Sequence, residues 1–262
     1  ALSCGVALAL LAANGRDVDR VELADVVARA ERYTGTQGGG MDQAVILCAR
    51  RGHALAVSFA PLRVRSAKVP EDWVFLVAHS GTVAEKSGAA QATYNARTGE
   101  CRAALETVWA AVGEGVPPSN DYRPLLAAAD PEHLLEVARE VLKTPLLARF
   151  RHAITEVLRV SEAEEALVSS DLDGFGRIMD ASHESLRDDY EVSTPELDRI
   201  VELAREAGAA GARLTGAGLG GAALILGTKH TEDQVREALA VHYYGPRRDS
   251  PSRNAVFRAI PA

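Results

Sequence analysis

A single carboxylate stands directly behind a run of three glycines in the first part of the sequence. The glycines occupy positions 38–40, and Asp42 follows them and precedes an apolar run at residues 44–47. Glycine adopts positive φ and lets another group approach the backbone closely. A flexible segment that delivers one acid to the start of a buried element suits a general base. A turn followed by an exposed aspartate has the same pattern, and composition by itself favours that simpler interpretation.

A second glycine-rich stretch, residues 213–221, lies near the other end of the chain. It contains Gly216, Gly218, Gly220 and Gly221. Successive glycines permit close backbone approach and can form a concavity that binds anions. A glycine-rich hairpin turn is the alternative, and the stretch alone does not decide between them.

Two further side chains could contact a ligand. Tyr94 combines an aromatic face with one hydroxyl, which suits a hexose with its apolar C–H faces and polar edges. The alternative is a tyrosine at a helix start, half-buried against the core. His79 follows a buried strand, but no acid or nucleophile is adjacent in sequence to orient it, so a structural role in the loop is favoured.

Hydrophobic periodicity predicts the elements that position these residues. Helices are expected at residues 1–13, from residue 19 towards the glycine run, at 91–112, from residue 131, along the stripes that contain Phe150 and Leu172, from residue 195, and at 232–242. Residues 113–120 are expected to break the helical pattern. Strands are expected at residues 44–48, 53–59, 73–78, 211–215, 222–226 and 254–260, with a connecting segment between Pro61 and Pro70. The order of the later elements is typical of a ferredoxin-like half.

Composition excludes several classes of protein. The chain has 262 residues, a net charge of −7 and 47% hydrophobic residues, which is ordinary globular composition and argues against nucleic acid or an anionic membrane as main partner. Three scattered cysteines are too few for a disulfide framework or a metal knuckle and indicate reduced thiols in the cytosol. The apolar residues 1–13 lack the features of a signal peptide and are too short to span a bilayer.

Four stretches resemble, in the same order, the motifs of one kinase family. They are G-G-M-D-Q within residues 31–43, Y-N-A-R-T-G-E-C at 94–101, S-H-E-S-L-R-D-D-Y at 182–190 with P-E-L-D at 195–198, and R-L-T-G-A-G-L-G-G at 213–221. This set is similar to that of the galactokinase family, which belongs with homoserine, mevalonate and phosphomevalonate kinases to the GHMP small-molecule kinases. Four ordered matches spread over most of the chain are poorly explained by chance.

The resemblance implies an α+β, two-domain GHMP-kinase fold. Residues 1–69 would be the remainder of the amino-terminal α/β kinase domain and would carry the catalytic aspartate. Residues 70–262 would form the carboxy-terminal domain, a ferredoxin-like half with helices inserted after its first strand and with the glycine-rich third motif.

The resemblance also implies the chemistry, which is the transfer of a phosphoryl group from ATP, with Mg²⁺, to the anomeric hydroxyl of galactose. Asp42 would accept the proton of that hydroxyl or position it electrostatically, and the sequence does not decide between these roles. Gly39, Asp42 and Tyr94 would bind the sugar. Gly216, Gly218, Gly220 and Gly221 would lie beside the nucleotide phosphates. No protein ligand for a metal is singled out. Arg187 and Asp188 are expected to be structural ties near the site.

Two motifs of the family are absent from the given sequence. A Gly-Leu-Ser-Ser-Ser phosphate loop would precede the helix at residues 1–13, and a segment with sugar contacts and an arginine would lie further upstream. The chain is therefore expected to be an amino-terminally truncated galactokinase, inactive by itself. A cytoplasmic monomer or weak homodimer is expected, with sugar and ATP as partners and neither nucleic acid nor membrane.

Two alternatives remain open. The glycine run and its neighbours also resemble N-acetylgalactosamine kinase, although Tyr94 favours galactose because that branch often has phenylalanine there. A non-catalytic, galactose-sensing paralogue is the other alternative, and the presence of Asp42 argues against it.

Overall fold

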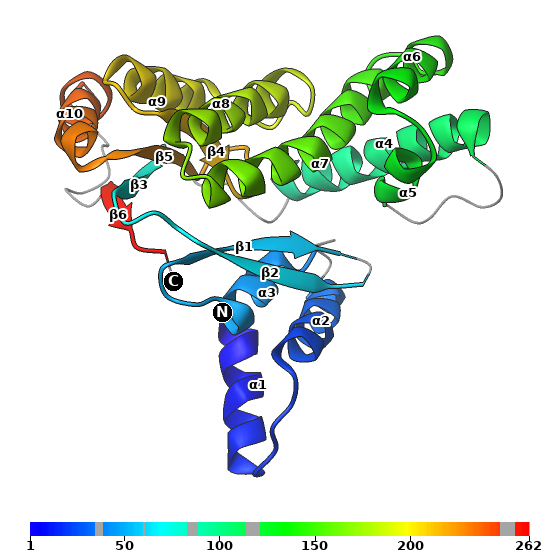
Figure 1. The fold of residues 1–262 in the computed structure, drawn as a ribbon, viewed down its shortest axis with the longest axis horizontal. Helices are drawn as coiled ribbons and strands as arrows, with labels where there is room; N and C mark the ends of the chain where they lie inside the picture. Colours follow the sequence, from blue (N-terminus) through cyan, green and yellow to red (C-terminus); the bar gives the residue numbers. More distant parts are fainter. Residues whose placement is uncertain (35–38, 60, 83–88, 114–120, 247–254, 262) are drawn as a thin grey trace. The chain divides into compact units, whose positions relative to one another are not determined.

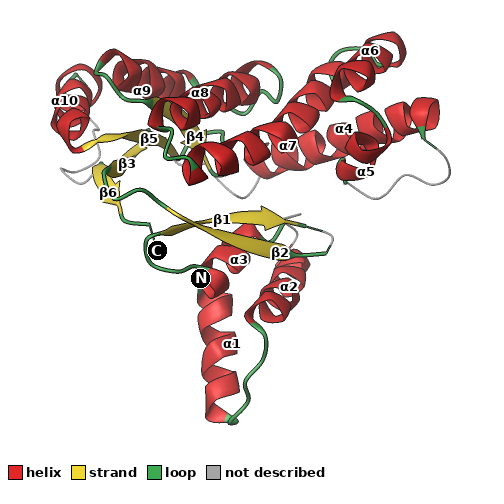
Figure 2. Ribbon diagram, in the orientation of Figure 1, coloured by secondary structure: helices red, strands yellow, loops and turns green. Residues whose placement is uncertain are grey.

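The computed structural model describes residues 1–34, 39–59, 61–82, 89–113, 121–246 and 255–261. The chain forms two compact units, Ala1–Glu71 with Ile260–Ala262, and Asp72–Ala259. Helices and strands occur in both (Figure 2). The division into functional domains at residues 69 and 70 stays a prediction, as does the helix break over residues 114–120, which lies outside the described residues.

The described part of the first unit contains helices and one antiparallel hairpin. Its elements are α1 (Leu2–Ala13), α2 (Arg20–Glu31), a 3₁₀ turn (Arg32–Thr34), α3 (Met41–Cys48), β1 (His53–Ser58) and β2 (Arg63–Lys68). The Asp19 carboxylate caps α2 by accepting hydrogen bonds from the amides of Val21 and Glu22, at 2.9 and 3.0 Å. Cys4, Leu23, Ala24, Val27, Ala44 and Leu47 form the core of this unit. The three helices therefore share one small core.

The predicted strand at residues 44–48 is wrong, because these residues belong to α3. A short apolar run cannot be assigned to strand or helix by periodicity alone. Gln43, Ala44 and Leu47 are buried, whereas Val45 and Ile46 are exposed, which is the pattern of one helical face. Asp42 therefore lies in the first turn of a helix.

The segment between Pro61 and Pro70 contains a strand that the sequence did not reveal. β2 pairs antiparallel with β1, in a register that places Val57 opposite Val64. Arg63 and Arg65 flank Val64, but Ser66 stands where the next apolar residue of an alternating strand would be, and charged residues of this kind are common on exposed strands. The predicted strand at residues 53–59 is confirmed as β1.

The second unit begins with a buried strand and ends with an edge strand. Its elements are β3 (Trp73–His79), α4 (Ala89–Val112), α5 (Arg123–Ala128), α6 (Pro131–Val141), α7 (Leu146–Val168), α8 (Leu172–Asp188), α9 (Pro195–Glu206), β4 (Gly211–Thr215), β5 (Ala222–Thr228), α10 (Lys229–Leu239), a π-helical turn (Ala240–Tyr244) and β6 (Val256–Ala259). The predicted helix at residues 232–242 thus begins three residues earlier and ends in a different helical form.

The sheet of this unit has the order β4-β5-β3-β6, with antiparallel neighbours. Helices α4 to α9 are inserted between β3 and β4, and α10 connects β5 to β6. This is the β-α-β-β-α-β arrangement of a ferredoxin-like fold, as predicted. Helices α8, α9 and α10 lie on one side of the sheet (Figure 1), and Leu76, Leu197, Ile200, Ile225 and Leu239 pack in the core between them.

The inserted helices have a second core of their own. Leu105, Leu125, Leu134, Phe150 and Ile154 are completely buried where α4, α5, α6 and α7 meet. The predicted start of α6 is confirmed, because the Asp130 carboxylate accepts a hydrogen bond from the Glu132 amide at 2.9 Å and Pro131 occupies the first helical position.

Two glycines allow α8 to approach β4 closely. A Cβ atom at Gly176 would lie 2.0 Å from the carbonyl oxygen of Ala210, and one at Gly211 would lie 2.2 Å from the carbonyl oxygen of Gly176. Contacts this short do not occur, so any larger residue must separate the helix from the strand.

We expect Gly176→Ala to lower the free energy of unfolding by about 1–3 kcal/mol, because the overpacking exceeds the gain in helix propensity. Gly99→Ala in α4 is the matched control, since nothing lies within 4 Å of a Cβ atom there. The control should raise stability by about 0.5–1 kcal/mol. Urea unfolding measures both, and a Gly176→Ala variant as stable as the wild-type protein would contradict the close packing.

Candidate active site

Asp42 is exposed in the first turn of α3, where an acidic side chain is favoured by the helix dipole. Gly40 precedes the helix with φ of 92°, and its Cβ atom would lie 2.8 Å from the Cβ atom of Ala28. Glycine is therefore required here by both conformation and space. Gly39 is exposed beside it, and Gly38 lies outside the described residues. Gly39 and Asp42 thus lie close together at the start of α3.

A carboxylate that the sequence analysis did not single out fixes this helix start. Glu31, at the end of α2, accepts hydrogen bonds from the buried side-chain amide of Gln43 and from the Ser3 hydroxyl, the latter at 2.7 Å. One carboxylate thereby connects α1, α2 and α3. Gln43 follows Asp42 directly, so this contact holds the turn that carries the candidate base. Both Glu31 and Gln43 lie within the motif at residues 31–43, which was the available signal.

The glycine loop, residues 216–221, connects β4 to β5 in the second unit. Positive φ values occur at Gly216, Gly218, Leu219, Gly220 and Gly221. Thr215, Gly216 and Ala217 are exposed, whereas Gly218 and Gly220 are buried. The loop therefore presents its first residues to solvent and packs its later ones against the protein. Residues of positive φ that alternate with one of negative φ, as Gly216 and Gly218 do with Ala217, can turn their amides towards an anion.

The end of β3 holds one side of the glycine loop. The Ser80 amide and hydroxyl both donate to the carbonyl oxygen of Gly221 at 2.8 Å, and the Gly221 amide donates to the carbonyl oxygen of Thr82 at 2.9 Å. His79 accepts a hydrogen bond from the Gly81 amide at its Nδ1 atom, at 2.9 Å. This contact agrees with the structural role predicted for His79.

Polar side chains of α8 hold β4, the strand that leads into the loop. The Asp180 carboxylate accepts from the Ala212 amide at 2.8 Å, and His183 Nδ1 accepts from the Leu214 amide at 3.3 Å. The neutral His183 ring then carries its proton on Nε2, which lies 3.2 Å from Asp198 Oδ1. Burial lowers the pKa of His183, and the attraction of Asp198 opposes this effect. A neutral ring is therefore the state that fits β4.

The prediction that Arg187 and Asp188 are structural ties is wrong. They are exposed and bind each other at 2.8 Å, and exposed ion pairs contribute little to stability. The hydrogen bond to Arg187 lowers the pKa of Asp188. The buried carboxylate is the next one, Asp189, which binds Arg151 and accepts from the Ser185 hydroxyl at 3.2 Å. Sequence alone could not distinguish two adjacent aspartates at a helix end.

Tyr94 is half-buried on α4, in the same unit as the glycine loop. Its carbonyl oxygen accepts from the Thr98 hydroxyl at 3.2 Å, which is a local helical contact. Tyr190 lies nearby, and its pKa is raised chiefly by burial, with smaller contributions from Cys101 and Tyr94. Gly39 and Asp42 belong to the first unit and Tyr94 and the glycine loop to the second, so the structure groups the predicted site residues in two sets.

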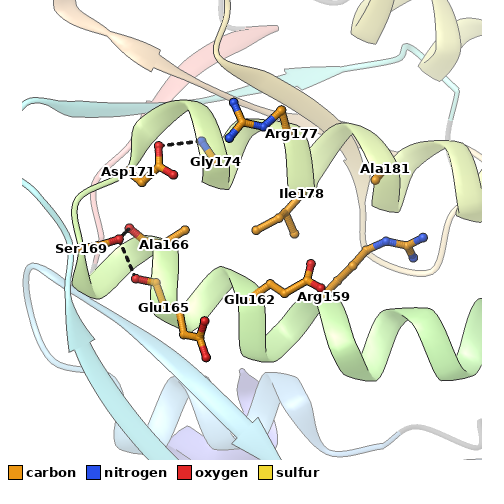
Figure 3. A pocket seen from close by; sticks show the side chains of 10 residues that line it. All are labelled: Arg159, Glu162, Glu165, Ala166, Ser169, Asp171, Gly174, Arg177, Ile178 and Ala181. Atoms are coloured by element: carbon orange, nitrogen blue, oxygen red, sulfur yellow. Dashed lines mark hydrogen bonds between the residues drawn. The ribbon is translucent and has the colours of Figure 1, made fainter. Parts of the chain in front are cut away.

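A groove between α7 and α8 does not contain any of these residues. Its volume is about 510 Å³, and Arg159, Glu162, Glu165, Arg177 and Ile178 contribute to its lining (Figure 3). Charges of both signs face it.

Among the described residues, no group of three or more histidine, cysteine, aspartate or glutamate side chains could hold a metal ion, and no helix is both long and apolar enough to cross a membrane.

Two protein-family models match the chain and agree with its two units. The model "GHMP kinases N terminal domain" matches residues 1–50, and "GHMP kinases C terminal" matches residues 163–245. The fold is shared with mevalonate kinase from L. major in complex with R-mevalonate, at a TM-score of 0.56 and 19% identity, covering 94% of this chain and 60% of that one. Fold and sequence models therefore define the class as GHMP kinase.

Relatives within that class are more similar. Galactokinase from Roseiflexus sp. is 34% identical over 98% of this chain and 62% of its own length, and galactokinase from Bos taurus is 34% identical over 85% and 53%. The structure of Lactococcus lactis galactokinase complexed with galactose matches at a TM-score of 0.83 and 27% identity, over 99% of this chain and 63% of that one. The chain belongs to the galactokinase family, as its motifs predicted, and spans between half and two thirds of the length of these relatives.

The buried histidine His152 on α7 predicts that the free energy of unfolding depends on pH. His152 is buried, stacks on Tyr190 with ring centroids 4.5 Å apart, and lies 3.0 Å from the Ser185 hydroxyl. Burial lowers the pKa of His152 to about 4, from 6.5 in the unfolded chain. Between pH 6.5 and pH 4 the unfolded chain binds a proton at this histidine and the folded chain does not. The stabilisation that comes from the neutral histidine is therefore complete above pH 6.5, and the free energy of unfolding falls as the pH decreases towards 4.

We expect wild-type protein to lose about 2 kcal/mol more unfolding free energy than His152→Gln between pH 7.5 and pH 5. His133→Gln is the control, because His133 is exposed on α6 and should leave the pH dependence unchanged. Urea unfolding at a series of pH values measures this. Equal pH dependence in wild type and His152→Gln would show that His152 is not held neutral.

Proposed function

We propose that the protein is an ATP-dependent galactokinase, which phosphorylates the anomeric hydroxyl of galactose to give galactose 1-phosphate. The observation that carries this proposal is the exposed Asp42 at the start of α3, held by Gln43 and Glu31 within a sequence that is 34% identical to Roseiflexus galactokinase. The match to a galactokinase complexed with galactose supports the same substrate.

The proposed roles follow from the chemistry of each group. Asp42 accepts the proton of the anomeric hydroxyl or orients that hydroxyl by its charge, and Gly39 offers backbone to the sugar. Tyr94 contributes an aromatic surface with a hydroxyl. The glycine loop, through Gly216, Gly218, Gly220 and Gly221, lies beside the phosphates of ATP in this proposal, and its positive φ values support an anion-binding conformation.

Mg²⁺ is proposed as the partner of the triphosphate. This ion usually keeps several waters and binds through substrate phosphates and one or two carboxylates, so it needs no dedicated protein cage. The ion would screen the charge that develops on the transferred group, while the protein positions the reacting atoms.

The cellular setting is also a proposal. We propose a cytoplasmic protein, a monomer or weak homodimer, that binds neither nucleic acid nor membrane. The net charge of −7 and the three free cysteines support this setting. We also propose two domains, of which residues 1–69 carry the catalytic aspartate and residues 70–262 carry the third motif.

Two other functions would use the same fold. An N-acetylgalactosamine 1-kinase would have higher kcat/KM on N-acetylgalactosamine than on galactose, whereas Tyr94 favours the opposite order. A galactose-sensing paralogue would bind the sugar without turnover. Comparison of kcat/KM for both sugars in the full gene product separates all three possibilities.

Asp42→Asn tests the catalytic role, because the substitution keeps the shape of the side chain and removes its basicity. We expect kcat of the full gene product to fall by about 10²–10⁴-fold, with little change in nucleotide affinity and with stability retained. Asp25→Asn on α2 is a matched control, since Asp25 is an exposed aspartate whose contact is the exposed Arg29, and it should keep kcat. A folded Asp42→Asn enzyme with wild-type kcat would refute the assignment.

A further inference from the structure

Residues 189–192, the first part of the connection between α8 and α9, are held by two arginines from other helices. Arg149 on α7 donates to the carbonyl oxygen of Asp189, and Arg97 on α4 donates to that of Tyr190 at 2.9 Å. Both arginines also bind the carboxylate of Glu191, at 2.7 Å from Arg149 and 3.0 Å from Arg97. The arginines thus bind three consecutive residues, Asp189 and Tyr190 through their carbonyl oxygens and Glu191 through its carboxylate.

Glu100 on α4 completes this group. It accepts from Arg149 at 2.7 Å and binds Arg97 at 3.1 Å. We call the four residues Arg97, Glu100, Arg149 and Glu191 the arginine brace. Arg149 is only 1% exposed, so its charge has lost its water and is balanced by these acceptors. Guanidinium groups bind several acceptors in fixed directions, which makes the brace stiff.

The conformation of Glu191 indicates that the brace imposes the path of the segment. Its φ is 54°, in the left-handed region that is unfavourable for a glutamate. Such a conformation persists only when surrounding contacts enforce it. The two arginines supply such contacts through the Glu191 carboxylate, and the Val192 amide adds a hydrogen bond to the Leu186 carbonyl oxygen at the end of α8, at 3.0 Å. Loss of the carboxylate should therefore loosen the segment.

Val192, which follows Glu191, connects this segment to the glycine loop. The Val192 carbonyl oxygen accepts from the Leu219 amide at 2.7 Å, and Val192 is itself 1% exposed. A Cβ atom at Gly218 would lie 2.3 Å from the same oxygen. The loop is therefore pressed against Val192 and cannot keep its path if Val192 moves.

We propose that Arg149 and Arg97 are positioning residues for nucleotide binding, acting through Glu191 and Val192 on the glycine loop. This inference rests on the proposed role of the loop beside the ATP phosphates. The brace touches neither ATP nor sugar in this proposal. Its loss raises KM for ATP and leaves KM for galactose unchanged, whereas general destabilisation would not separate the two substrates.

Glu191→Gln is the test variant, because Glu191 is half-exposed and the substitution removes the charge while keeping the shape. In the purified chain without ligand, we expect the Leu219 amide to exchange about tenfold faster with solvent, as measured by NMR. In the full gene product, KM for ATP should rise about tenfold. KM for galactose should stay at the wild-type value.

Arg236→Gln is the matched control. Arg236 on α10 also binds a carboxylate, Glu232 at 2.9 Å, and a backbone carbonyl, Val256 at 2.8 Å, but it lies outside the brace. Its substitution should leave the exchange of the Leu219 amide and both KM values unchanged. Arg149→Lys, which keeps the buried charge but loses the forked geometry, should behave like Glu191→Gln.

The possible failures can be told apart. Wild-type exchange at Leu219 in both Glu191→Gln and Arg149→Lys would overturn the brace itself. Faster exchange with unchanged KM for ATP would overturn its link to nucleotide binding. If ATP binds the wild-type enzyme without protecting any amide of the glycine loop, the proposed function of the loop fails, and the positioning proposal falls with it.

Discussion

The hydrogen bond between the Val192 carbonyl and the Leu219 amide is the contact on which the candidate phosphate site depends. It is 2.7 Å long, it is buried, and it can form only because residue 218 has no side chain. Around it the loop takes five positive φ values, one of them at a leucine. Such a conformation persists only when contacts with neighbouring residues hold it. Residues 189–192 give that support on one side and Ser80, at the end of β3, on the other.

A comparable arrangement positions the candidate base in the first unit. Glu31 bonds to Ser3 and Gln43 and so connects three helices next to Asp42. Asp42 is exposed and the candidate phosphate site lies in glycine-rich backbone, and in both units polar contacts fix a neighbouring residue. Preorganisation of this kind is what phosphoryl transfer requires, because the protein contributes mainly position and charge.

Sequence predicted the parts of this arrangement that are local. The ferredoxin-like half, most helices and the galactokinase family could be recognised because periodicity, caps and ordered motifs are properties of adjacent residues. The run at residues 44–48 was assigned to a strand because a short apolar run carries no period. β2 was not predicted because Ser66 breaks the apolar alternation after Val64. The arginine brace could not be predicted, because Arg97 and Arg149 meet Glu191 across 94 and 42 residues of chain.

Hydrogen exchange at Gly216 and Ala217 tests the central claim most directly, namely that the glycine loop contacts the nucleotide. Both residues are exposed in the structure and are the first two residues of the glycine loop. In the full gene product, saturating Mg²⁺–ATP should slow the exchange of their amides, and galactose alone should not. Exchange at both amides that is unchanged by Mg²⁺–ATP would contradict the account.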